Sequence, residues 1–140
     1  MNEKFDLGRF VTAQEPLIGR ALQELWRGRK QTHWMWFVFP QIAGLGFSTM
    51  SHRYAISGLE EARAYLDHSI LGPRLRECTQ AVLDVKGRSA HDIFGPPDDM
   101  KFHSSMTLFS EAAPSESLFA SALKKYFDGE EDAPTLTTLS

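Results

Sequence analysis

Hydrophobic residues recur along this chain at helical spacing, and residues that begin or end helices separate the periodic stretches. Pro16 precedes one such stretch, and Gly28 stands where its periodicity ends. Proline suits the first turn of a helix, and glycine suits the position just beyond the last turn. The pattern therefore predicts a helix between these two residues, after a shorter helix that Asp6 is expected to cap.

Similar signals divide the rest of the chain. Ser57–Glu60 has the spacing of a capping box, and Ser89 with Asp92 opens a helix of one or two turns that Gly95 closes. Three more helices are expected to begin near Gly72-Pro73, Pro96-Pro97 and Ser115. The sum predicts an all-α fold, an irregular compact array of six to eight short helices in a single domain over residues 1–140. Residues 130–140 are expected either to add a short helix after Pro134 or to fray.

The segment His33–Phe39 is continuously apolar after its histidine and is followed by Pro40. Its length and aromatic content fit a buried strand, and periodicity alone does not separate that reading from a buried helix. The chain offers no second convincing strand to pair with it, so a buried helix or an extended core segment is favoured. Gly44–Ser48, with two glycines, is expected to be a loop.

Composition and charge narrow the class of protein. The chain is 42% hydrophobic and 24% charged, which is typical of a globular domain. Its net charge of −3 disfavours a duplex nucleic-acid binder, which usually carries a basic stripe. No apolar run is long enough to span a membrane and no secretion signal is visible, so a cytoplasmic protein is expected. The single cysteine, Cys78, lies on an apolar helical stripe and is assigned to the core.

Polar residues next to the apolar segments are the candidates for chemistry. His33 lies between basic residues and the aromatic run, where a half-buried imidazole could act as a general base. Asp99 stands at a predicted helix start, where capping is the simpler explanation and general-base catalysis the sharper one. These two residues are the predicted catalytic pair. The predicted ligand-binding residues are Arg29, Lys30, Trp34, Trp36, Gln41, Lys101, Ser104 and Ser105.

Together these residues predict a small-molecule site, for binding or hydrolysis, between the segments His33–Gln41 and Pro97–Phe109. Aromatic walls and a basic rim suit a nucleotide-like ligand. No metal-ligand spacing and no cofactor motif is present. Two alternatives stay open: an interaction or homodimer module that uses Phe47–Ile56, and a tight polar-aromatic core with no site at all.

The strings Gly28–Lys30, His33–Gln41 and Gly44–Gly46 closely resemble an uncharacterised bacterial family known as domain of unknown function 1810. The stretch Phe94–Phe109 and shorter blocks agree, so the resemblance covers nearly the whole chain. One departure is Ser69, where the family pattern has proline. The resemblance implies a compact all-helical domain and supplies no activity. Some members are labelled calpastatin, which does not fit this chain, because an inhibitor that folds on binding is polar and poor in aromatic residues.

Overall fold

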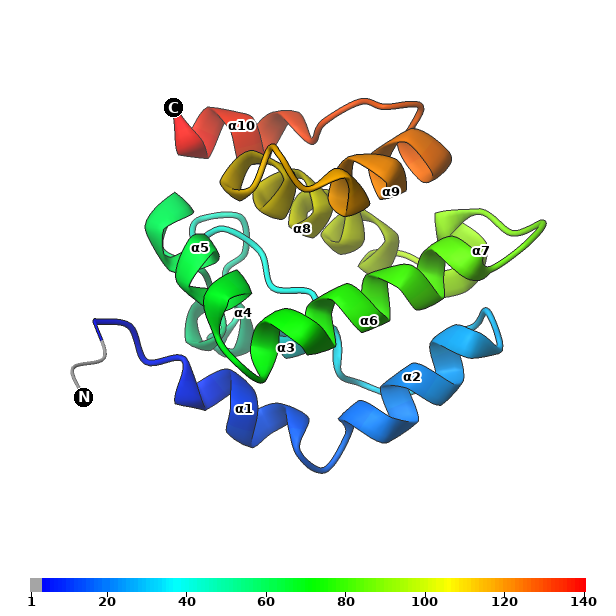
Figure 1. Cartoon of the computed structure of the whole chain (residues 1–140), viewed down its shortest axis with the longest axis horizontal. Coiled ribbons are helices and arrows are strands. Elements are labelled where there is room, and N and C mark those ends of the chain that lie inside the picture. The colour runs from blue at the N-terminus through cyan, green and yellow to red at the C-terminus, as the bar shows by residue number, and fades with distance from the viewer. Residues whose placement is uncertain (1–3) are drawn as a thin grey trace.

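The computed structural model describes residues 4–140, which form ten helices joined by short loops (Figure 1). The first half contains α1 (Gly8–Gln14), α2 (Ile18–Trp26), α3 (Met35–Val38), α4 (Thr49–Arg53) and α5 (Leu59–Asp67). The second half contains α6 (Leu71–Asp84), α7 (Ala90–Phe94), α8 (Asp98–Ala112), α9 (Ser117–Phe127) and α10 (Ala133–Leu139). The predicted all-α class is confirmed. The helices outnumber the expected six to eight because α3 and α4, of four and five residues, are too short to show periodicity.

Helix α8 is the centre of the fold. Four helices, α5, α7, α9 and α10, pack against it. Accordingly, every residue from Ser104 to Phe109 is buried, including three with hydroxyl side chains. A helix that is covered on several sides cannot keep one polar face, because each face meets another element. This explains why the hydroxyl-rich stretch of α8 lies inside the molecule rather than at its surface.

Helix α6 forms the second support of the core. It packs against α2, α3, α5 and α9 and crosses the front of the molecule in Figure 1. Cys78 is fully buried on it, as predicted. The turn from α5 into α6 is very tight, because a Cβ atom added at Gly72 would lie 2.1 Å from the carbonyl oxygen of Leu66. Glycine is therefore a packing requirement at this position.

The helix ends test the predicted caps. The capping box of Ser89 and Asp92 is present, and Gly95 follows α7 with a positive φ of 72°. Two predicted caps are wrong. No side chain caps α1, whose N-cap residue is Leu7 rather than Asp6. Helix α5 begins one residue later than a Ser57 cap requires, so Gly58 is its N-cap residue.

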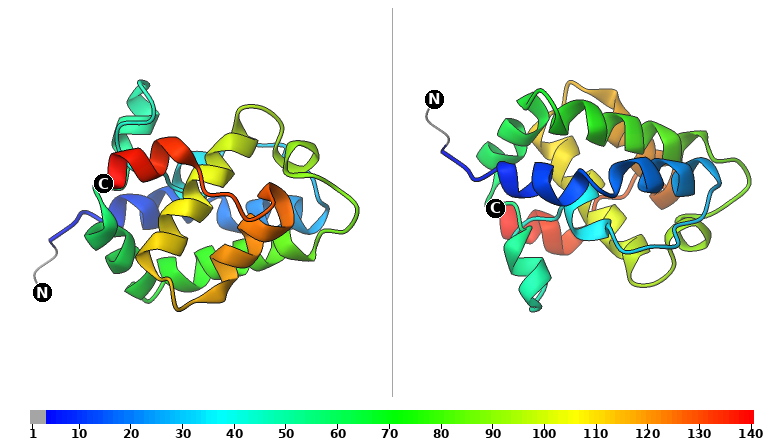
Figure 2. Two further views of the ribbon diagram at one scale, coloured as in Figure 1. Left: turned by 90° about the horizontal axis from the view of Figure 1, so that it is seen from above. Right: turned by 90° about the horizontal axis from the view of Figure 1, so that it is seen from below.

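The last residues of the described chain are ordered as a helix. Asp132 caps α10 by accepting a hydrogen bond from the backbone N–H of Thr135. The left panel of Figure 2 shows α10 lying across α8, in agreement with the contacts between them. Of the two outcomes expected for residues 130–140, the short helix is the one observed.

The segment around α4 projects from the body of the molecule, as both panels of Figure 2 show. Its base is held by an isolated parallel bridge between Ile42 and Ile56, the only β pairing among residues 4–140. Phe47, near its tip, is 95% exposed. Gly44, with a φ of 97°, lies in the loop that leads out to α4.

Candidate functional site

The two segments predicted to form a site do meet, and a cleft of about 240 Å³ lies between them. We call it the Trp36 cleft. It lies between the loop that follows α3, the first half of α8 and the start of α10. Its lining residues are Trp36, Gln41, Leu45, Gly46, Pro97, Met100, Lys101, Ser104, Asp132 and Pro134. The walls are thus mainly apolar, with four polar side chains among them.

Trp36 and Lys101 form the boundary between the cleft and a smaller hollow. Trp36 is half-buried, and the Nζ atom of Lys101 lies 3.5 Å from the centre of its ring system. At that distance the ammonium group interacts favourably with the negative face of the indole. Trp36 and Lys101 thus line both cavities as a contacting pair.

The smaller hollow measures about 100 Å³ and is more polar. Asp98 dominates it, because its carboxylate pairs with the Nζ atoms of Lys30 at 2.8 Å and Lys101 at 3.4 Å. His33 lines the same hollow and is exposed to solvent. Both lysines are thus held by a carboxylate that sits in the first turn of α8, where negative charge is favourable.

Asp132 supplies the acidic group of the Trp36 cleft and is only 7% exposed. Its Oδ2 atom accepts hydrogen bonds from the hydroxyls of Ser104 at 3.0 Å and Thr135 at 2.7 Å, besides the α10 cap. Its backbone N–H donates to the hydroxyl of Thr107 at 2.8 Å. This network fastens the start of α10 to α8 and fixes one wall of the cleft.

The predicted catalytic pair is not assembled. Asp99 accepts a hydrogen bond from Nδ1 of His91 at 3.1 Å, and neither Asp99 nor His91 lines the cleft or the hollow. His33 instead shares its hollow with Asp98. Successive residues in a helix point about 100° apart. Only the orientation of α8 in the fold decides whether Asp98 or Asp99 faces the hollow, and the sequence does not give that orientation.

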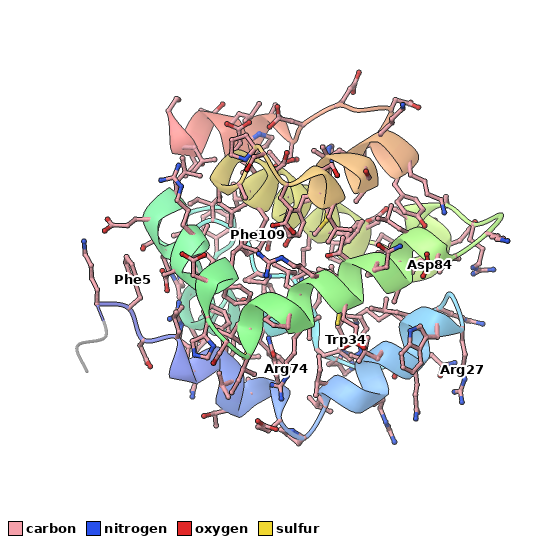
Figure 3. The ribbon with its side chains drawn as sticks, viewed as in Figure 1. Phe5, Arg27, Trp34, Arg74, Asp84 and Phe109 are labelled. Atoms are coloured by element: carbon pink, nitrogen blue, oxygen red, sulfur yellow. The ribbon has the colours of Figure 1, made fainter. Side chains whose placement is uncertain are left out.

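Two predicted ligand-binding residues belong to the core. Trp34 borders the smaller hollow but has no exposed surface, and its Nε1–H donates to Oε1 of Glu24 at 2.9 Å. Figure 3 shows it in the middle of the molecule, between the ribbons of α2 and α6. Ser105 is also fully buried and lines neither cavity. Its hydroxyl finds no hydrogen-bond partner within residues 4–140.

The other predicted residues divide between the two cavities and the surface. Trp36 and Lys101 line both cavities, Gln41 and Ser104 line the cleft, and Lys30 lines the hollow. Arg29 is exposed outside both, and its backbone N–H donates to the carbonyl of Glu24. The cleft residues that sequence reasoning missed include Leu45, Met100, Asp132 and Pro134. The proline-and-aspartate start of α10 was a usable capping signal.

Glu24 is a buried acid that the sequence did not single out. Burial alone would raise its pKa, but hydrogen bonds from the N–H groups of Gln31 and Thr32, the Thr32 hydroxyl and the Trp34 indole lower it to about 2. It is therefore ionised although it is only 4% exposed. Because these donors come from the segment that leads into α3, Glu24 fixes the position from which Trp36 is presented.

Among residues 4–140, histidine, cysteine and acidic side chains do not gather in a group of three or more able to hold a metal ion. No helix in this part of the chain combines the length and apolarity needed to cross a bilayer.

Comparisons with known proteins agree on the fold and name no activity. No curated protein matches the sequence. The crystal structure of the conserved hypothetical protein Rv1873 from Mycobacterium tuberculosis superimposes with a TM-score of 0.96, at 55% sequence identity over 98% of each chain. The family described as protein of unknown function DUF1810 matches residues 4–139. The chain therefore belongs to the DUF1810 family, as the sequence resemblance indicated.

Proposed function

We propose that this protein binds a small molecule in the Trp36 cleft. The observation that carries the proposal is the convergence of three separate stretches of chain on one open cavity of about 240 Å³. Clefts with mostly apolar walls and a few fixed polar groups are the usual form of small-molecule sites. The polar groups here are Gln41, Lys101, Ser104 and Asp132.

The size of the cleft limits the ligand. Drug-sized molecules usually occupy cavities of about 300 to 1,000 Å³. A cleft of about 240 Å³ suits one fused ring system with a small polar substituent, and it is too small to enclose a dinucleotide. Within the nucleotide-like class, a nucleobase or nucleoside is the best match.

The polar groups suit the edge of a nucleobase. Gln41 carries both a donor and an acceptor, Lys101 carries donors, and Asp132 carries an acceptor. Asp132 and Ser104 are already bonded to each other, so their positions are set before a ligand arrives. Pre-set groups lower the entropy lost on binding.

The geometry supports binding more than hydrolysis. A general base must reach the proton that it removes, and the predicted bases do not face the Trp36 cleft. His33 lies in the neighbouring hollow and Asp99 pairs with His91. Asp132, the acid that does line the cleft, already accepts hydrogen bonds from Ser104 and Thr135.

The test uses the ¹⁵N-labelled full chain and a panel of nucleobases, nucleosides and nucleoside monophosphates. A ligand in the cleft should shift the indole N–H resonance of Trp36 and leave that of Trp34 in place, because Trp34 is buried. Trp36→Leu and Gln41→Ala should each weaken binding about tenfold or more.

Trp26→Leu is the matched control, since Trp26 is 62% exposed on α2 and lines no part of the cleft. It should leave the affinity within twofold. If no compound in the panel moves the Trp36 resonance, or if both tryptophan variants weaken binding equally, the proposed site is wrong.

A second candidate function is self-association through the projecting segment. Phe47 is 95% exposed and Met50 is 39% exposed, on a segment that stands clear of the body (Figure 2). A contiguous patch of exposed apolar side chains often marks a protein–protein interaction site. Light scattering over a range of concentrations should show a dimer that Phe47→Ser dissociates, whereas a monomer at all concentrations would remove this candidate.

A further inference from the structure

We propose that a second cavity, on the α2 side of the molecule, is an oxyanion site for a phosphate group. This Arg20–Arg27 hollow measures about 260 Å³, and all its lining residues are polar: Arg20, Gln23, Glu24, Arg27, Gln31 and Thr32. It shares no lining residue with the Trp36 cleft. The proposal is therefore independent of the proposed function.

The two arginines supply the positive charge. Arg20 lies on α2 and Arg27 is the C-cap residue of the same helix, about two turns or 10.5 Å further along, which two long side chains can span toward one ligand. Arg27 stands at the end of the helix, as Figure 3 shows. An arginine guanidinium presents parallel N–H donors that match the oxygens of a phosphate.

Both guanidinium groups are available to a ligand. Neither makes a hydrogen bond or an ion pair with another side chain or carbonyl in residues 4–140. Arginines that support the fold behave differently. Arg9 binds Glu61, Arg76 binds Glu116 with two nitrogens, and Arg88 donates to the carbonyl of Gly28.

Glu24 lines the same hollow but pairs with neither arginine. Its carboxylate is satisfied by two backbone N–H groups, a hydroxyl and an indole, so it needs no cation. It also sets the depth of the site, because its negative charge repels an anion that approaches the floor. The phosphate is therefore expected at the mouth, between Arg20 and Arg27, with the side-chain amides of Gln23 and Gln31 within reach.

The experiment titrates the ¹⁵N-labelled full chain with inorganic phosphate and, separately, with glycerol phosphate, at an ionic strength held constant with chloride. The reporters are the backbone N–H groups of Gln31 and Thr32, which donate to Glu24. Both anions should produce saturable shifts. Arg20→Gln and Arg27→Gln should each weaken binding about fivefold or more, because each removes a charge-assisted hydrogen-bond donor.

Arg29→Gln is the matched control, since it removes the same charge two residues from Arg27 but lies outside the hollow. It should change the affinity less than twofold. Tighter binding of the ester would show that the organic part also occupies the hollow, and equal binding would show that the phosphate alone is recognised. Shifts that never saturate, or an affinity that falls as much in Arg29→Gln as in Arg27→Gln, would show only non-specific electrostatic attraction of the anion. Either result would overturn the proposed site.

Discussion

At the scale of single residues, Glu24 is the position on which the local structure depends most. Three buried or partly buried N–H donors, from Gln31, Thr32 and Trp34, converge on its carboxylate. Glu24→Ala leaves them without an acceptor, so the free energy of unfolding should fall by about 3 kcal/mol. Urea unfolding measures this change. Glu77→Ala, at an exposed position of α6, should stay within about 0.5 kcal/mol of the parent, and an equal effect of the two substitutions would contradict the assignment.

The pH dependence of stability tests the same residue. The native pKa of Glu24, about 2, lies below its ordinary value of 4.5, so the native state binds fewer protons than the unfolded state between these values. The contribution of Glu24 is therefore complete above pH 4.5 and is lost as the pH falls toward 2. In Glu24→Gln the free energy of unfolding should fall less steeply over this interval. An unchanged slope would show that Glu24 does not titrate in this range.

The sequence indicated the correct segments, but within a segment it often did not indicate which of two nearby residues faces a cavity. Trp34 and Trp36 are two positions apart in one apolar run, and only the second lines the Trp36 cleft. Asp98 and Asp99 are adjacent, and only the first meets the lysines. Periodicity cannot make these choices in a one-turn helix or at a helix start, because too few residues define the face that points inward.

At the scale of elements, the junction of α5 and α6 depends on the absence of a side chain. In Gly72→Ala the new methyl group would overlap the carbonyl oxygen of Leu66, so the two helices must separate. We expect the free energy of unfolding to fall by about 2–3 kcal/mol. Gly19→Ala on α2 meets no atom within 4 Å, and alanine favours helix, so this variant should gain up to about 1 kcal/mol. Equal thermal stability of the two variants would contradict this account.

The attachment of α10 depends on Asp132. Asp132→Ala removes the helix cap and leaves the hydroxyls of Ser104 and Thr135 without their shared acceptor. The amide protons of α10 should exchange with solvent about tenfold faster or more, since a cap and a buried hydrogen bond each contribute about 1 kcal/mol. Hydrogen exchange followed by mass spectrometry measures this locally. Glu130→Ala, at an exposed side chain nearby, should not change the exchange, and a similar increase in both variants would refute the role of Asp132.

Local signals predicted some helix ends correctly, although Asp6 and Ser57 do not cap α1 and α5. The capping box at Ser89 and the glycines that follow α2 and α7 act on backbone groups a few residues away. Such short-range signals can be recognised in the sequence without knowledge of the fold. Helix α4 was not predicted. Ser48 caps it, but none of its five residues is buried, so the sequence shows no apolar face that would indicate a helix. What the sequence could not supply was the position of α10, which depends on hydrogen bonds of Asp132 with α8 residues 25 and 28 positions earlier.

At the scale of the whole molecule, the pair of Glu111 and Glu131 gives the free energy of unfolding a pH dependence opposite to the one that Glu24 gives it. A hydrogen bond with Glu111, and then burial, raise the pKa of Glu131 to about 7 from its ordinary value of 4.5. The native state therefore holds the proton more tightly than the unfolded state, and the free energy of unfolding falls as the pH rises from 4.5 to 7. Glu131→Gln should be about 1 kcal/mol more stable than the parent at pH 8, a value kept small because the pair is partly exposed.

Thermal unfolding at pH 5 and pH 8 measures this difference. Glu130→Gln removes the same charge next to the pair and should show the smaller effect of a surface substitution. If both variants respond alike at the two pH values, the pair does not share a proton.

Two of the three chain segments that form the Trp36 cleft could be predicted from the sequence. The approach of His33–Gln41 to the start of α8 could be inferred from polar residues that adjoin apolar ones in both segments. The third wall, from Asp132 and Pro134, could not, because its segment is too polar to indicate which surface it would cover. The near-complete match to the DUF1810 family shows the fold and leaves the chemistry of the cleft to be tested.

The buried thiol of Cys78 can serve as a chemical probe of unfolding. Burial first, and then the charge of Glu77, raise the pKa of this thiol to about 12, and none of its surface is exposed. Alkylating reagents attack the thiolate, so they should modify the chain only when α6 detaches from the core. Because no other cysteine is present in the sequence, the rate of modification in native buffer would report the opening of the core directly, in any of the variants above.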